Sequence, residues 1–104
     1  MNHDLVYQRS GGLCEAQVST QCTGRGEHVH HRKLRSRGGG DGVANLAHLC
    51  HHCHDWVHAY PKEATRSGWM VSSWSDPALA RLWRYGRWVR LSDDGGMEPV
   101  EVLS

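Results

Sequence analysis

The sequence predicts an α+β fold: a small zinc-stapled core of two short strands and a helix, followed by a β-rich appendage at the C-terminal end. Three observations indicate it. The 104 residues are only 38% hydrophobic and include no Phe, so a core has little material. Four cysteines could supply a metal staple instead. Eight of the nine histidines lie within residues 28–58, which concentrates metal-binding and proton-transferring groups in one short segment.

Local signals place the elements of the N-terminal half. Asp4 can cap a helix that runs to Ser10, where two glycines stop it. The polar alternation around Val29 suits a short strand over residues 27–32. Residues 36–42, which are rich in glycine, predict an exposed, flexible loop.

A second strand is expected over residues 45–49, and a helix over roughly residues 53–60. Pro61 ends this helix or starts the next turn. These elements make a core over residues 1–66, with no internal repeat.

Residues 67–104 are expected to form a small β-rich appendage that packs on the core and is not independent of it. Strands are predicted over residues 69–74, 87–91 and near 98–103, with a short helix opened by Asp76-Pro77 and a turn over 92–96. The four tryptophans after Gly68 are expected to fill the core of this appendage: Trp69, Trp74, Trp83 and Trp88.

Charge and targeting signals limit the possible functions of the protein. The net charge is only +1, but a basic stripe is formed by Arg32, Lys33, Arg35 and Arg37. Such a stripe is typical of phosphate binding and also of an ordinary solvated loop. No signal peptide or membrane-length apolar run is visible, so we expect a cytoplasmic protein without a membrane partner.

The cysteines form two pairs that predict one metal site. Cys14 and Cys22 are separated by seven residues, and Cys50 and Cys53 have the usual knuckle spacing of two. In a reducing compartment four such cysteines favour structural zinc over disulfides. Free thiols are the alternative, and a redox dithiol is disfavoured because no βαβ context surrounds the second pair.

The histidines predict a second metal site. His54 and His58 are four residues apart, so on a helix they share one face and can hold one ion. His30, on the first strand, is the best third ligand, and open coordination positions would make the site catalytic. An all-imidazole site favours Zn, Ni, Co or Mn, whereas Mg prefers oxygen ligands.

Residue types and spacings together carry a resemblance to a known family. His31, Asn45 and His54 are spaced by 14 and 9 residues, with His30 before them and His58 after them, and cysteines flank the whole. This pattern, over roughly residues 12–60, resembles the HNH endonuclease family, and in particular its small bacteriophage-type proteins. The resemblance implies a ββα-metal, treble-clef-like core.

The resemblance also implies roles for individual residues. His31 would be the general base that activates water, and the Asn45 amide would tie the hairpin together and position that base. His30, His54 and His58 would hold the catalytic divalent ion. The basic stripe would contact phosphates: Arg32, Lys33, Arg35 and Arg37.

Two functions from different classes follow. The first is a metal-dependent endonuclease that hydrolyses DNA phosphodiester bonds, with phage terminase or other packaging proteins as further partners and the bacterial host cytoplasm as its location if the chain is phage-encoded. The alternative is a non-catalytic zinc-binding module for a nucleic acid or a protein. Zinc does not discriminate between them, and the oligomeric state stays open.

Overall fold

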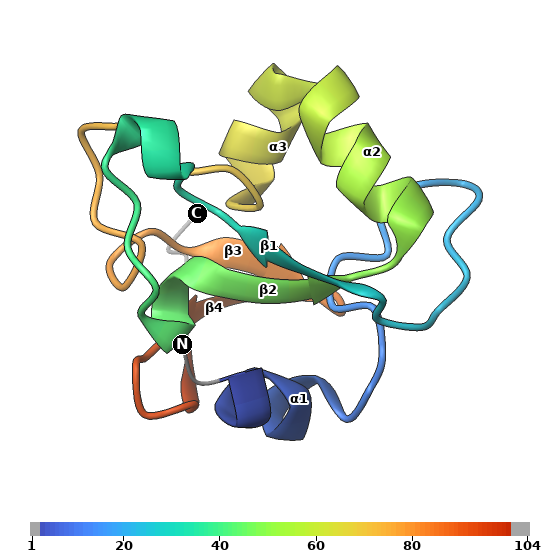
Figure 1. Cartoon of the computed structure of the whole chain (residues 1–104), viewed down its shortest axis with the longest axis horizontal. Coiled ribbons are helices and arrows are strands. Elements are labelled where there is room, and N and C mark those ends of the chain that lie inside the picture. The colour runs from blue at the N-terminus through green and yellow to red at the C-terminus, as the bar shows by residue number, and fades with distance from the viewer. Residues whose placement is uncertain (1–2, 101–104) are drawn as a thin grey trace.

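The computed structural model describes residues 3–100, which form two small sheets and three α-helices around a shared core (Figure 1). In chain order the elements are α1 (His3–Ser10), β1 (His28–His31), η1 (Arg35–Arg37), η2 (Val43–Asn45), β2 (Leu46–Leu49), α2 (His51–Ala59), α3 (Pro61–Ser67), β3 (Leu82–Arg84), β4 (Arg87–Leu91) and β5 (Met97–Pro99), where η1 and η2 are single 3-10 turns. None of the helices in this part of the chain has the length and hydropathy to span a bilayer.

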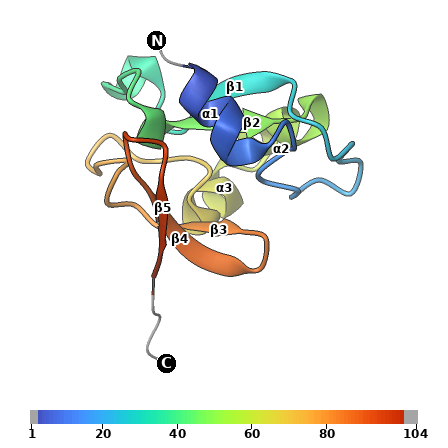
Figure 2. The same ribbon diagram turned by 90° about the horizontal axis from the view of Figure 1, so that it is seen from below.

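An antiparallel hairpin of β1 and β2 forms the centre of the molecule, as the sequence predicted. His30 lies opposite Ala47 and His31 opposite Leu46. Side chains alternate across a strand, so the buried His30 and the partly exposed His31 point to opposite faces. Helix α1 covers one side of the hairpin, and α2 and α3 lie on the other (Figures 1 and 2).

Helix α2 begins two residues earlier than the sequence predicted, because Cys50 serves as its N-cap. The Cys50 Sγ accepts a hydrogen bond from the Cys53 backbone N–H at 3.3 Å. Pro61 starts a separate helix, α3, which ends at Gly68 with a φ of 85°. Left-handed φ at this position is easily adopted by glycine.

The strand predicted over residues 69–74 and the helix predicted at Asp76 are wrong. Trp69, Met70 and Val71 are buried, but outside any sheet: the Val71 N–H donates to the Arg32 carbonyl at 2.8 Å. These apolar residues fill the core behind the hairpin instead of forming a ladder. Asp76 opens only a turn, in which its Oδ1 accepts from the Ala78 N–H at 2.9 Å.

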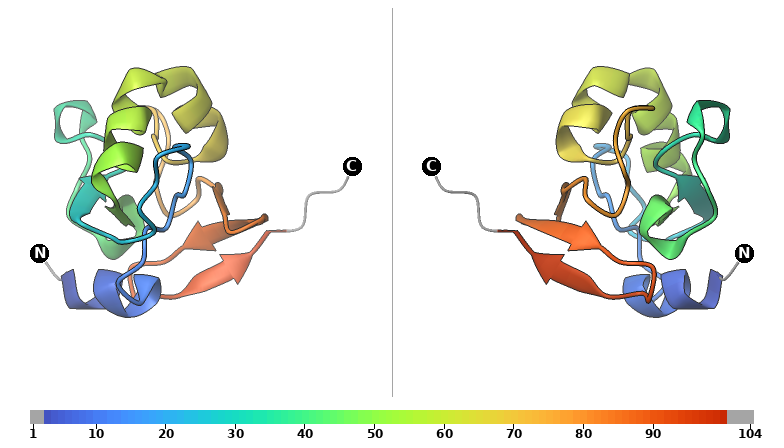
Figure 3. Two further views of the ribbon diagram at one scale, coloured as in Figure 1. Left: turned by 90° about the vertical axis from the view of Figure 1, so that its right-hand side faces the viewer. Right: turned by 90° about the vertical axis from the view of Figure 1, so that its left-hand side faces the viewer.

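Strands β3, β4 and β5 form a second antiparallel sheet, which extends to one side of the molecule (Figure 3). β3 was not predicted, and residues 101–103 of the predicted last strand lie outside the described residues. Leu82, Val89 and Leu91 share one apolar cluster with Cys14, Val57 and Trp69. The domain boundary near residue 66 stays a prediction.

Contrary to the sequence prediction, the four tryptophans after Gly68 do not all lie in the core. Trp69 is fully buried, and Trp83 and Trp88 stack edge to face with ring centroids 5.3 Å apart. Trp74, however, is 93% exposed and Trp83 is 43% exposed, so their assignment to the core is wrong.

A buried ion cluster joins the N-terminal segment of the chain to strand β3. Glu15 accepts from Arg9 at 2.9 Å and from Arg84 on β3 at 3.0 Å, and its Oε1 accepts from the His48 N–H at 2.9 Å. Burial alone would raise the pKa of Glu15, but the hydrogen bonds and positive charges of its neighbours lower it below the ordinary value of 4.5.

Candidate metal centres and active site

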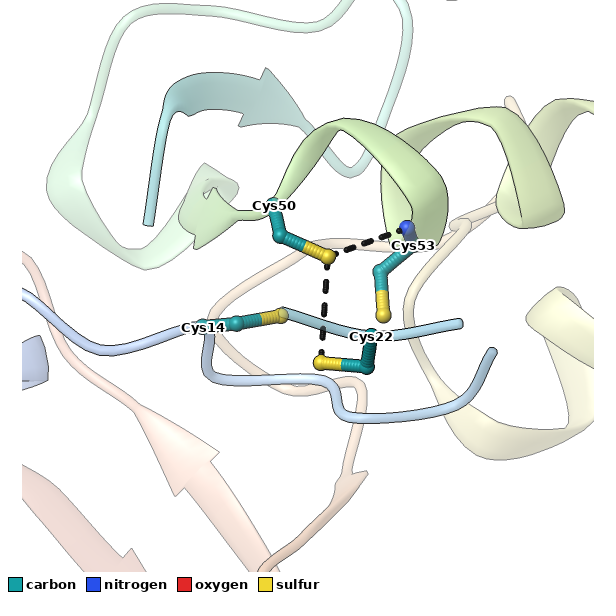
Figure 4. Close-up of side chains that lie close together, drawn as sticks. All are labelled: Cys14, Cys22, Cys50 and Cys53. Carbon is teal, nitrogen blue, oxygen red and sulfur yellow. Dashed lines mark hydrogen bonds between the residues drawn. The ribbon is translucent and has the colours of Figure 1, made fainter. Parts of the chain in front are cut away.

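The four cysteines converge on one point, between the N-terminal loop and the start of α2 (Figure 4). Their sulfur atoms all lie within 4.8 Å of one another, and the Cys22 and Cys50 sulfurs are 3.7 Å apart. A tetrahedral zinc–thiolate site with Zn–S bonds of about 2.3 Å implies sulfurs about 3.8 Å apart. The cluster therefore has the donor set and spacing to bind zinc.

Backbone donors support the same interpretation. Besides Cys53 N–H to Cys50, the Gly24 N–H donates to the Cys22 sulfur at 3.4 Å. Burial raises the pKa of the Cys53 and Cys22 thiols, whereas hydrogen bonds from the Cys53 and Thr23 N–H groups overcome burial and lower the pKa of Cys50 to about 7. A cation at the centre would stabilise all four thiolates.

His30, His54 and His58 form a second cluster, which we call the imidazole triad. Each offers one ligand atom, and these atoms lie within 4.8 Å of one another. The rings of His54 and His58 are 4.8 Å apart on α2, and His30 approaches them from β1 at 5.4 and 5.7 Å. The hairpin and α2 thus bring together the three ligands that the sequence predicted.

The orientation of His30 is fixed by the backbone. Its Nε2 donates to the Trp69 carbonyl at 2.8 Å, which leaves Nδ1 as the nitrogen with a lone pair. Burial and the neighbouring rings of the triad lower the pKa of His30 to about 4. Burial also lowers the pKa of His54, with His58 contributing. Neutral imidazoles are the form that binds a metal.

His31 is turned away from the triad and contacts a carboxylate instead. Its Nε2 lies 2.9 Å from the Asp41 Oδ1, and Arg35 contacts the same oxygen at 3.0 Å. The hydrogen bond from His31, together with Arg35, lowers the pKa of Asp41. An ionised Asp41 holds the proton of the neutral ring on Nε2 and leaves Nδ1 able to accept one. The sequence analysis missed Asp41, whose signal is its place as the lone carboxylate in the glycine-rich loop.

The Asn45 amide connects the two ends of that loop. Its Oδ1 accepts from the Lys33 N–H at 2.7 Å, and its Nδ2 donates to the Lys33 and Gly40 carbonyls at 3.0 and 2.9 Å. Asn45 itself is only 3% exposed. These contacts fix the chain on both sides of Asp41, and so position the partner of His31.

The prediction that Arg32 contacts phosphate is wrong. Arg32 is fully buried, and its guanidinium donates to four backbone carbonyls at 2.8 to 3.0 Å: Gly68, Ala44, Pro77 and Ala80. Burial lowers the pKa of Arg32 to about 10, so it is still charged at neutral pH. Arg32 therefore links the hairpin to the segment after α3 and cannot reach DNA.

The remaining members of the stripe stay near the surface. Lys33 donates to the Ser75 carbonyl at 3.1 Å, Arg35 pairs with Asp41, and Arg37 is exposed. His28 stacks on His54 with ring centroids 5.2 Å apart, and the exposed Asp55 pairs with His51 at 3.2 Å, not with the triad.

A family comparison agrees with this geometry. Residues 14–59 match the family model described as HNH endonuclease, a range that includes all four cysteines, the imidazole triad, His31 and Asn45. Searches of curated proteins and of solved structures gave no match. This match to the HNH endonuclease family supports the sequence resemblance. HNH domains bind a divalent metal, and their family implies DNA as a substrate.

Proposed function

We propose that this protein is a metal-dependent endonuclease that hydrolyses DNA phosphodiester bonds. The observation that carries the proposal is the pairing of two arrangements on one strand. His30 joins two other imidazoles in a cluster that could hold a metal ion, while the next residue, His31, contacts a carboxylate and keeps a nitrogen available for a proton.

Each group would perform a separate part of the hydrolysis. His31 would take a proton from the attacking water through Nδ1, while Asp41 holds the ring and stabilises the positive charge that develops on it. Asn45 would keep the loop that carries Asp41 in place. The half-buried Lys33 and the exposed Arg35 and Arg37 would contact the DNA backbone without reading bases.

His30, His54 and His58 would hold one divalent ion, which would supply charge stabilisation at the phosphate and at the leaving 3′ oxygen. Three imidazoles suit Mn, Ni, Co or Zn, and Mg is the least favoured candidate on the same grounds. The four cysteines would hold a structural zinc ion. A role beside phage terminase rests on the resemblance alone.

A plasmid-nicking assay tests the proposal. The wild-type protein should nick supercoiled DNA, and EDTA should stop the reaction. Addition of Mn, Ni, Co, Zn or Mg should restore it. His31→Ala should lower the rate by about a hundredfold to ten-thousandfold, the range that general bases contribute, while zinc content and thermal unfolding stay unchanged. A wild-type protein that binds DNA and never nicks it with any of these ions would instead be the non-catalytic zinc module.

A further inference from the structure

A basic hollow contains two cationic side chains, Lys62 and Arg66, that have no role in the mechanism above. It has a volume of about 380 Å³ and lies between η1 and α3. Its charged lining residues are Arg37, Lys62 and Arg66, and the rest of its lining consists of Pro61, Thr65 and Met70. We call it the basic hollow.

Both walls of the basic hollow are connected to the candidate active site. On the α3 side, Pro61 follows the triad residue His58 by three positions. Met70 follows Trp69, whose carbonyl fixes the His30 ring. On the η1 side, Arg37 lies two residues after Arg35, which contacts the partner of His31. The residues that line the hollow are therefore close in the chain to residues that form or contact the metal and base groups.

All the charged side chains that line the hollow are positive. Three cationic side chains line it with no carboxylate among them, and in the described range 3–100 none of the three forms an ion pair. All three residues are exposed. Like charges gathered on one concave surface repel each other, and a bound anion relieves that repulsion.

We propose that the basic hollow binds a backbone phosphate of the DNA strand beside the one that is cleaved. The inference rests on the proposed function for the choice of DNA as the anion. Lys62 and Arg66 from α3 and Arg37 from η1 contact this phosphate from two sides. The bound strand is thereby held across the imidazole triad, so α3 is a part of the DNA interface.

Duplex binding measured by fluorescence anisotropy tests the hollow. Every protein carries His31→Ala, so that the fluorescein-labelled duplex stays intact. Lys62→Ala combined with Arg66→Ala removes two charges from the hollow. Arg87→Ala combined with Arg90→Ala removes two exposed charges from β4 and is the matched control. Thermal unfolding of each variant checks that the fold is kept.

The hollow variant should bind the duplex about tenfold more weakly, and the slope of log K against log salt should become shallower by about 1, because the one phosphate held in the hollow is no longer neutralised. The control should lose less than about twofold. Equal losses in the two double variants, an unchanged salt slope in the hollow variant, or no duplex binding by the parent protein would each overturn the proposal.

Nicking by the wild-type protein, measured in parallel, separates this proposal from the proposed function. If the wild type nicks DNA and the hollow variant binds the duplex normally, the hollow proposal fails and the endonuclease assignment stands. If the wild type never nicks DNA but the hollow variant alone loses affinity, the phosphate site stands and the endonuclease assignment fails.

Discussion

The Nε2 of His31 and the Oδ1 of Asp41 lie 2.9 Å apart, although the two residues are ten positions apart in the chain. This contact orients the proposed base, so Asp41→Asn should lower the nicking rate constant by up to about a hundredfold through misplacement and wrong ring protonation. Single-turnover nicking at saturating protein measures the effect. Zinc content should change little, because Asp41 contacts neither metal cluster.

Asp55→Asn is the matched control for this prediction. Asp55 also pairs with a histidine, His51, at 3.2 Å and is exposed, but it lies outside the proposed base pair. Equal nicking rates for the two variants would contradict an orienting role for Asp41.

The buried Arg32 is expected to stabilise the fold, not to contact phosphate. Arg32→Met should lower the free energy of unfolding by about 3 kcal/mol or more, because two buried and two partly buried carbonyls lose their donor. Arg32→Lys should rescue little, since an ammonium group cannot replace the planar fork of donors. Urea unfolding measures both.

Arg37→Met controls for the loss of a positive charge and should change stability by less than about 0.5 kcal/mol. A stable Arg32→Met protein whose only defect is weak DNA binding would show that Arg32 acts at the surface after all.

Glu15 predicts how stability depends on pH. Its folded-state pKa is lowered below the ordinary 4.5, so the unfolded chain binds the proton more readily. The stabilisation is present above about pH 4.5 and is lost as the pH falls through the lowered pKa. Thermal unfolding between pH 7 and pH 3 should show this loss in the wild type.

Glu15→Gln isolates that contribution. The variant should be destabilised at neutral pH by about 3 kcal/mol, because Arg9 and Arg84 lose their buried counter-charge. Below pH 4.5 the difference from the wild type should narrow. A constant difference over the whole range would mean that Glu15 is not the titrating group.

The sequence predicted the hairpin and α2 because their signals are local. Val29 and the polar alternation around it mark β1, and the spacing of His54 and His58 places both on one helix face. The imidazole triad followed from these elements, with His30 on β1 as its third member. Local signals could not reveal Asp41, because its contact with His31 depends on how the glycine-rich loop closes and on the bonds that Asn45 makes across it.

The errors share a physical cause. Arg32 looks like a surface cation in the sequence, and only the tertiary fold supplies four carbonyls from distant segments to bury it. The run from Trp69 to Val71 has strand-like composition, but burial against the hairpin and α3 decides its conformation. Lys62 and Arg66 were passed over because a basic hollow exists only once α3 is placed beside η1.

The two clusters of metal-binding side chains should respond differently to the loss of a ligand. Cys50→Ser removes one of the four sulfur ligands from the cluster that joins the N-terminal loop to α2. The variant should therefore lose bound zinc and unfold at a much lower temperature. His58→Ala removes an exposed ligand from the triad and should abolish nicking while the fold and one equivalent of zinc per chain remain. Both variants are tested by measuring zinc content with atomic emission, thermal unfolding and the nicking rate. If His58→Ala unfolded the protein as Cys50→Ser does, the triad would be a structural site, and the division between a stapling zinc and a catalytic ion would be wrong.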